Sequence, residues 1–241
     1  MAMLGGLRWV KRRLFPSLSD LDPFPIDAWT DPAYASWFER HKTPVQELNA
    51  QRSVSLSQRP CFSIVVPLFR TPIEYLCDMV DSVLGQTYDR LELILANASP
   101  EDTALAAKVS EYRVSDSRIR SISLPENRGI AGNTAVGIAE AEGDFVCFLD
   151  HDDFLEPDAL FRFAVALDDD PSIDVLYCDE DLVEWMQGKG FVHKHPFFKP
   201  CYSPELMLCK NGIIHLMTIR RSILDEMPSA DARFDGAQDY N

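Results

Sequence analysis

Short apolar runs alternate with helix-like periodicity along most of this chain. Residues 62–67 and 91–96 are nearly unbroken apolar runs bounded by turn-forming residues, which predicts two strands buried on both faces. The segment between these runs carries apolar residues at three- and four-residue spacing. This spacing predicts an amphipathic helix with a buried face made of Ile73, Leu76, Val80, Val83 and Leu84.

The same alternation continues to residue 178. Further strands are expected at 118–124, 145–149 and 173–178, and further helices from residue 99, at 130–141 and at 157–167. Alternating strands and helices predict an α/β fold, with a mostly parallel sheet and helices on both faces. Because such sheets bind ligands beyond the carboxyl ends of their strands, the strand ends near Pro67, Asn97 and Asp150 are expected to meet at one crevice.

The strand expected at 145–149 runs directly into three carboxylates around one histidine, Asp150-His151-Asp152-Asp153. Like charges at a strand end repel one another, and a divalent cation would relieve that repulsion. Hard carboxylate oxygens suit Mg²⁺ or Mn²⁺. A solvated acidic turn is the alternative for such a cluster.

Composition narrows the class of protein. The chain has 241 residues, enough for one large α/β domain or one domain plus an arm. Its formal net charge of −15 argues against a nucleic-acid or anionic-membrane binder, because phosphate backbones require a basic face. A small phosphorylated ligand is still compatible with this charge, since a bound metal would neutralise it locally.

The six cysteines are scattered and include no Cys-x-x-Cys pair, so neither a disulfide framework nor a zinc site is expected. A reducing, cytoplasmic location is the simplest interpretation. No apolar run approaches the length of a membrane span. Four basic residues interrupt the apolar residues at the N-terminus, and this pattern does not fit a signal peptide.

Residues 1–58 lack a sustained period and are interpreted as an N-terminal arm ahead of a domain over 59–241. Basic residues beside Leu4, Leu7, Trp9, Val10 and Leu14 suggest a short amphipathic helix. Such a helix would lie on a membrane surface, at the inner face of the plasma membrane, or pack on the domain; packing is favoured. Residues 34–41 are expected to form another short helix.

Several motifs together resemble the inverting, family-2 type of glycosyltransferase with the GT-A fold. A subgroup found among bacterial polysaccharide and O-antigen enzymes is the most similar. The resemblance covers about residues 60–241 and depends on the order and spacing of the motifs. The matching segments are 62–69 (FSIVVPLF), 81–88 (DSVLGQTY), 127–133 (NRGIAGN), 149–153 (LDHDD), 157–158 (PD), 177–181 (YCDED) and 198–200 (FKP).

The resemblance implies a nucleoside pocket lined by Pro67 and Phe69, with Phe69 against the base or ribose. Asn97 falls where the family usually has an aspartate that hydrogen-bonds the uracil edge. An amide has both a donor and an acceptor, so a UDP- or dTDP-sugar is favoured. Alone, Phe69 would be interpreted as a core aromatic residue and Asn97 as a turn former.

The Asn-x-Gly loop of the family corresponds to Asn127, Arg128 and Gly129, where a helix start can present N–H groups to an anion. A solvated surface arginine is an equal alternative for Arg128. The family's DxD motif implies that Asp150 contacts the ribose or the metal and that Asp152 ligates the metal. By the same resemblance His151 is non-ligating.

Asp153 is interpreted as a residue behind the metal ligands or as a cap of the next turn. Two weaker features follow. Residues 179–181 could hold sugar hydroxyls or simply end a strand. His193 and His195 alternate, and two half-exposed histidines are favoured over a metal pair.

Asp239 matches the acidic position of the family's catalytic Glu-Asp motif, where Gln238 replaces the glutamate. The resemblance implies that Asp239 accepts the proton of the acceptor hydroxyl. The chain stops two residues later, whereas the family normally continues, so the domain is expected to be C-terminally incomplete.

These features predict metal-dependent transfer of a sugar from a nucleotide-diphosphate sugar, with inversion, to a saccharide or lipid-linked acceptor in cell-surface polysaccharide synthesis. The alternative is a non-catalytic remnant that binds nucleotide sugars. A nucleotidyltransferase is disfavoured, because no glycine- and basic-rich phosphate loop follows the first strand.

Overall fold

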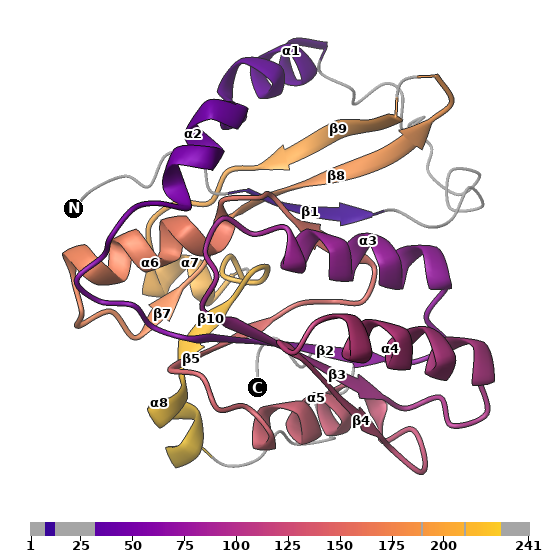
Figure 1. Cartoon of the computed structure of the whole chain (residues 1–241). Coiled ribbons are helices and arrows are strands. Elements are labelled where there is room, and N and C mark those ends of the chain that lie inside the picture. The colour runs from indigo at the N-terminus through magenta and orange to yellow at the C-terminus, as the bar shows by residue number, and fades with distance from the viewer. Residues whose placement is uncertain (1–7, 13–31, 189, 210, 228–241) are drawn as a thin grey trace.

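The computed structural model of the chain describes residues 8–12, 32–188, 190–209 and 211–227 (Figure 1). A six-stranded sheet forms its centre, with the strand order β4-β3-β2-β5-β10-β7. Its strands are β2 (Phe62–Leu68), β3 (Leu91–Asn97), β4 (Ile119–Ser123), β5 (Phe145–Phe148), β7 (Val175–Leu176) and β10 (Thr218–Arg220).

The sheet is mostly parallel, as the alternating pattern predicts. Strands β4, β3, β2 and β5 pair in parallel, whereas β10 is antiparallel to both of its neighbours, β5 and β7. The strand expected at 173–178 is only two residues long, and β10 separates it from β5. A three-residue strand such as β10 has too few positions to show a period, which explains its absence from the sequence prediction.

Helices cover both faces of this sheet (Figure 1). The expected helices are confirmed, with ends shifted by a few residues: α3 (Ile73–Leu84), α4 (Thr103–Ser115), α5 (Gly129–Ala139) and α6 (Ala159–Asp169). Alternate residues of β2 face opposite sides: Ile64 lies in a core with residues of α3, α4 and α6, and Val65 lies in a second core against Ile138 of α5.

A second, four-stranded sheet lies beside the first, with the order β6-β1-β8-β9. Its strands are β6 (Asp153–Leu155), β1 (Arg8–Arg12), β8 (Asp179–Met186) and β9 (Gly190–Phe197). The helix expected around residues 4–14 is wrong for residues 8–12, because their backbone pairs with β6 on one side and β8 on the other. Leu4, Leu7 and Leu14 lie outside the described residues.

Two helices of the arm contact the later part of the chain. The helix expected at 34–41 is confirmed as α1 (Pro32–His41), and α2 (Val45–Gln51) follows it. Tyr34 donates a hydrogen bond to Asp181 of β8, and Thr43 donates one of 2.7 Å to Asp158. The boundary expected near residue 58 stays a prediction. No helix in the described ranges is both long and apolar enough to span a membrane.

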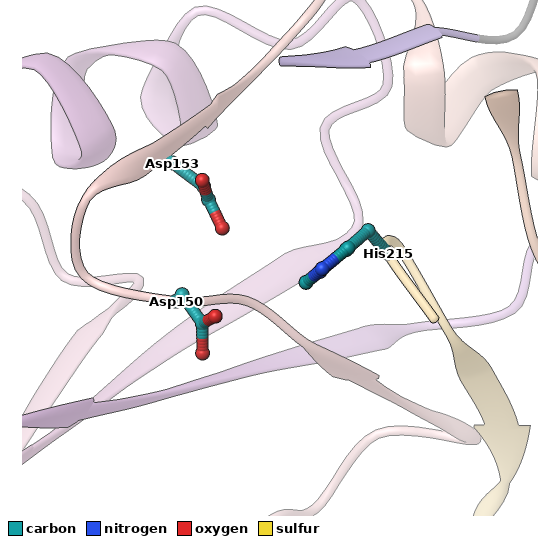
Figure 2. Close-up of side chains that lie close together, drawn as sticks. All are labelled: Asp150, Asp153 and His215. Atoms are coloured by element: carbon teal, nitrogen blue, oxygen red, sulfur yellow. The ribbon is translucent and has the colours of Figure 1, made fainter. Parts of the chain in front are cut away.

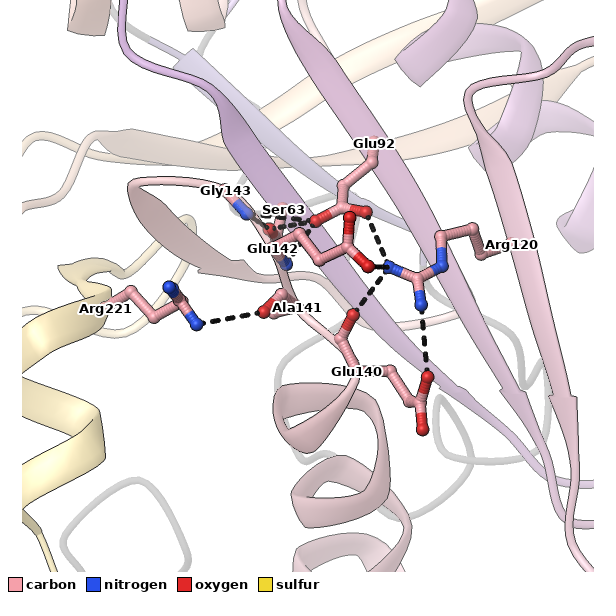
Figure 3. Close-up of polar contacts among 8 residues, drawn as sticks. All are labelled: Ser63, Glu92, Arg120, Glu140, Ala141, Glu142, Gly143 and Arg221. Atoms are coloured by element: carbon pink, nitrogen blue, oxygen red, sulfur yellow. Dashed lines mark hydrogen bonds and ion pairs between the residues drawn. The ribbon is translucent and has the colours of Figure 1, made fainter.

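A polar network ties the amino ends of the central strands together (Figure 3). The Glu92 carboxylate accepts hydrogen bonds from the Ser63 hydroxyl and the Glu142 N–H, each at 2.6 Å, and from the Gly143 N–H at 3.1 Å. Arg120 lies 3.2 Å from the same carboxylate. Burial alone would raise the pKa of Glu92, but these hydrogen bonds outweigh it and lower the pKa below its usual value.

Two short helices complete the described chain. The segment after β9 contains α7 (Pro204–Met207), and α8 (Arg221–Glu226) follows β10 directly. Leu224 of α8 packs against the same core as α5, so the chain returns to that face after the last strand.

Candidate metal and nucleotide site

Asp150, Asp153 and His215 come together at the carboxyl end of β5 (Figure 2). One potential ligand atom from each of them lies within 4.8 Å of the other two. Asp150 follows β5 and Asp153 opens β6, so the two carboxylates flank a tight turn in which the Asp153 N–H donates to the Asp150 carbonyl at 3.2 Å. The imidazole of His215 points toward both aspartates (Figure 2).

Strand pairing explains why His215 lies here, far along the chain from the acidic turn. β10 runs antiparallel to β5 with Thr218 opposite Cys147, and the Phe148 N–H donates to the Met217 carbonyl at 3.0 Å. Continuing this register brings His215 level with Asp150. Sequence reasoning missed His215, because its only local signal is a histidine within the apolar run 213–217.

The chemistry of this group suits a divalent cation. Asp153 is only 1% exposed, and Asp150 is half-buried. Two carboxylates held this close in a partly buried place favour a cation between them, since the alternative is like-charge repulsion. Carboxylate oxygens with one imidazole nitrogen fit Mn²⁺ well and Mg²⁺ acceptably.

Only one of the two carboxylates expected from the DxD motif lies in this group. Asp150 is in the group, whereas Asp152 is half-buried in the turn and is not one of the three. Asp153, interpreted from the sequence as a supporting residue, takes the place beside Asp150. His151 also lies in the turn and outside the group.

The loop that carries His215 is held by buried partners. The Lys199 ammonium donates to the carbonyls of Ile214 and His215, the latter at 2.5 Å. The Leu216 N–H donates to the Cys178 sulfur at 3.4 Å. His215 has a φ of 54°, in the left-handed region that a residue with a β-carbon rarely adopts. Burial lowers the pKa of Lys199, although the neighbouring Cys178 and Glu180 oppose that effect.

The ends of β2 and β3 lie side by side in the same sheet. Asn97 is 4% exposed, and its side-chain oxygen accepts a 3.0 Å hydrogen bond from the Ser99 N–H. The Ser99 hydroxyl in turn accepts from the Arg70 N–H at 2.7 Å. Asn97 therefore forms the turn through its side-chain oxygen, as the alternative interpretation expected.

Phe69 is half-buried against the core formed by Ala96, Ala98 and Leu124. The Arg70 guanidinium lies 5.0 Å from the centre of the Phe69 ring. Pro67 is half-buried in β2 one position before its last residue. Phe69 and Pro67 thus lie at the carboxyl edge of the sheet, where the crevice was expected.

The segment expected to meet an anion opens α5. The Asn127 side-chain oxygen accepts from the Gly129 N–H at 3.1 Å and from the Asn133 amide at 2.8 Å. The Arg128 N–H donates to the Asn133 oxygen at 3.0 Å. These two N–H groups are engaged by side chains of the chain itself, so contact with an anion would fall to the Arg128 guanidinium.

The two weaker candidates, the histidine pair and residues 179–181, lie in or beside the strands β8 and β9. His193 stacks on Phe38, with ring centres 3.6 Å apart, and shares a 3.0 Å hydrogen bond with Asp181. His195 has a φ of 51°, which breaks the regular alternation of β9. Residues 179–181 begin β8 and do not end a strand. Asp239 lies outside the described residues.

The chain is similar in sequence to proteins of polysaccharide synthesis. The chain is 33% identical over 209 residues to an O-antigen biosynthesis protein, RfbC, of Myxococcus xanthus, a match that covers 86% of this chain and 16% of that protein. It is 34% identical over 126 residues to a chondroitin synthase of Escherichia coli, covering 52% of this chain and 17% of the synthase. The chain thus spans about a sixth of the length of these relatives.

Solved structures share the fold. S. aureus TarS in complex with UDP aligns with a TM-score of 0.55 and 22% identity over 75% of this chain and 53% of that one. A mannosyltransferase from Pyrobaculum calidifontis, in complex with GDP-Man and Mn²⁺, aligns with a TM-score of 0.53 and 16% identity, covering 80% of this chain and 56% of that one. The expected GT-A fold is confirmed. The sequence pattern of glycosyl transferase family 2 matches residues 63–227, and the chain belongs to this family.

Proposed function

We propose that this chain transfers a sugar from a nucleotide-diphosphate sugar to a saccharide or lipid-linked acceptor, with inversion, in cell-surface polysaccharide synthesis. The observation that carries the proposal is the group Asp150, Asp153 and His215 at the carboxyl end of β5, within a chain of this family. In a sheet of this kind, that edge is where ligands bind.

The relatives support the choice of substrate class. Solved structures that share the fold include complexes with UDP, UDP-GlcNAc and GDP-Man, all of them nucleotides or nucleotide sugars. The relatives include an O-antigen biosynthesis protein and a chondroitin synthase. A nucleotide-sugar donor and a polysaccharide-type acceptor follow as the proposed partners.

We infer that Asp150, Asp153 and His215 would hold Mg²⁺ or Mn²⁺, with Asp152 as the alternative ligand from the DxD pattern. When bound, such a cation neutralises charge on the diphosphate that leaves the sugar. Asp150 and Asp153 supply the negative charge that attracts the cation, and His215 supplies a neutral nitrogen ligand.

The nucleoside is proposed to lie along the ends of β2 and β3. Phe69 would offer its ring to the base or ribose beside Pro67, and the amide nitrogen of Asn97 would donate to a carbonyl of uracil or thymine. This choice favours UDP- or dTDP-sugars as donors. The Arg128 guanidinium would contact a phosphate oxygen.

Asp239 is proposed as the general base. Its carboxylate would accept the proton of the acceptor hydroxyl while the hydroxyl oxygen attacks the anomeric carbon. The bond from that carbon to the diphosphate oxygen breaks on the opposite face, so a single displacement inverts configuration. This role is carried by the family motif alone.

A cytoplasmic location is part of the proposal, and all six cysteines are free thiols, as a reducing compartment would maintain them. Contact of the N-terminal arm with the inner face of the plasma membrane stays a second proposal. The rival function is a module that binds nucleotide sugars without transfer.

Calorimetry with UDP, dTDP, GDP and ADP, each with and without Mn²⁺, tests the donor proposal. We expect UDP or dTDP to bind, and Mn²⁺ to strengthen that binding by tenfold or more. Binding of GDP or ADP that is tenfold tighter than both pyrimidine nucleotides would overturn the choice of base. Donor binding without transfer to any saccharide or lipid-linked acceptor would favour the rival module.

A further inference from the structure

Lys199 contacts the backbone of His215, one of the residues proposed to bind metal. Its side chain is only 1% exposed, and its ammonium lies 3.3 Å from the Glu180 carboxylate. The same ammonium donates to the carbonyls of Ile214 and His215. One buried cation thus joins β8, the segment after β9 and the loop before β10.

These bonds act on a backbone that is unusual at this position. His215 has a φ of 54°, and the two consecutive carbonyls of residues 214 and 215 both reach the same ammonium. A left-handed residue other than glycine persists where its surroundings hold it. Removing the ammonium would take away a donor from two carbonyls in a partly buried loop, and the loop would relax to satisfy them elsewhere.

We propose that Lys199 is a positioning residue that aims the His215 imidazole at Asp150 and Asp153. This inference rests on the proposed function of the site as a metal site. The charge of Lys199 works in the opposite direction, since a positive group near the site repels a cation. A contribution of Lys199 to metal affinity must therefore come from geometry, and the two effects differ in sign.

The test is Mn²⁺ affinity of the full chain, measured by electron paramagnetic resonance with and without UDP. Lys199→Met should weaken Mn²⁺ binding about tenfold, whereas loss of charge alone would strengthen it. Lys194→Met is the matched control, because Lys194 is a buried lysine on β9, 6% exposed and paired with Glu184. We expect that variant to lose stability while its Mn²⁺ affinity stays within twofold of wild type.

A double-mutant cycle separates positioning from general damage. His215→Ala should weaken Mn²⁺ binding about tenfold, and Lys199→Met added to it should change the affinity less than twofold further, because the residue to be aimed is gone. Additive losses would overturn the positioning role. Unchanged or stronger Mn²⁺ binding in Lys199→Met alone would overturn it as well.

Lys199→Gln and Lys199→Arg decide the matter if the methionine variant does not fold. Arginine keeps charged donors and should retain Mn²⁺ affinity within about threefold, whereas the shorter, neutral glutamine should lose most of it. Wild-type affinity in a folded glutamine variant would contradict the inference. If wild type and His215→Ala bind Mn²⁺ equally, the metal site itself is wrong, which is a separate outcome.

Discussion

The two ends of the central sheet use carboxylates in opposite ways. At the amino end, Glu92 accepts hydrogen bonds from Ser63, Glu142 and Gly143 and lies beside Arg120 (Figure 3). At the carboxyl end, two aspartates and a histidine face one another within 4.8 Å (Figure 2). Glu92 lies on β3 and Asp150 follows β5, two strands of the same sheet, so the difference lies in what surrounds each charge.

Glu92 is an acidic residue that stabilises the fold, whereas Asp150 is an acidic residue proposed to bind a ligand. Glu92 has its negative charge matched by donors that belong to the chain, and its pKa is lowered accordingly, although burial alone would raise it. Asp150 lies in a group with a second carboxylate, that of Asp153, and like charges held close together favour a cation between them. We expect substitutions at the first end to change folding and substitutions at the second to change binding.

The largest expected effect is at Asp150. Asp150→Asn should weaken Mn²⁺-dependent binding of UDP about a hundredfold, equivalent to about 2.7 kcal/mol, because a charged ligand becomes neutral. The free energy of unfolding should stay the same or rise, since one of two repelling charges is lost. Calorimetry and urea unfolding check the two parts. Loss of stability with unchanged UDP affinity would contradict the expectation that the carboxyl end serves binding and the amino end serves folding.

The next largest effect tests which of two neighbouring aspartates at the carboxyl end of the sheet ligates the metal. Asp153→Asn should weaken Mn²⁺ binding about thirtyfold, while Asp152→Asn should change it less than threefold, because only Asp153 lies with Asp150 and His215. Each variant serves as the control for the other. The reverse result would restore the ligand pair implied by the DxD motif.

A smaller effect is expected at the amino end. Glu92→Ala removes the acceptor shared by Ser63 and two backbone N–H groups, so the free energy of unfolding should fall by about 1–3 kcal/mol. UDP and Mn²⁺ affinity should match wild type. Urea unfolding with calorimetry on the same sample checks both. A change of metal affinity here would show that the two ends are coupled.

The smallest effect is a pH dependence at the same residue. The folded-state pKa of Glu92 is lowered, so its contribution to stability is complete above its unfolded value of about 4.3 and is lost as pH falls through the folded pKa. The difference in unfolding free energy between wild type and Glu92→Gln should therefore be constant from pH 7 to pH 5 and shrink below about pH 4. A constant difference down to pH 3 would contradict this account.

The sequence predicted the parts of the fold that depend on local pattern. Residues 62–67 and 91–96 are apolar on both faces, and the apolar residues from Ile73 to Leu84 lie on one side of a helix. The sequence therefore predicted β2, β3 and α3. β1 and β10 were not, because five or three residues carry little pattern and their pairing partners are far along the chain.

The residues of the candidate site also differ in whether local sequence predicts them. Asp150 was predictable from its place at a strand end, whereas His215 joins it only through the antiparallel pairing of β10 with β5. The choice between Asp152 and Asp153 depends on one turn, in which neighbouring residues point in different directions, and spacing alone does not determine it. Asp239 stays a prediction from the family motif.

The position of β1 has a consequence for how the protein is made. β1 is synthesised before its partners, because Trp9 pairs with Leu155 and Glu180, which leave the ribosome much later. At about 5–20 residues per second, that wait lasts roughly ten to thirty seconds, during which the strand has neither of these partners. The second sheet, including the strand β6 that begins with Asp153, can therefore assume its final pairing only after β8 and β9 have been synthesised.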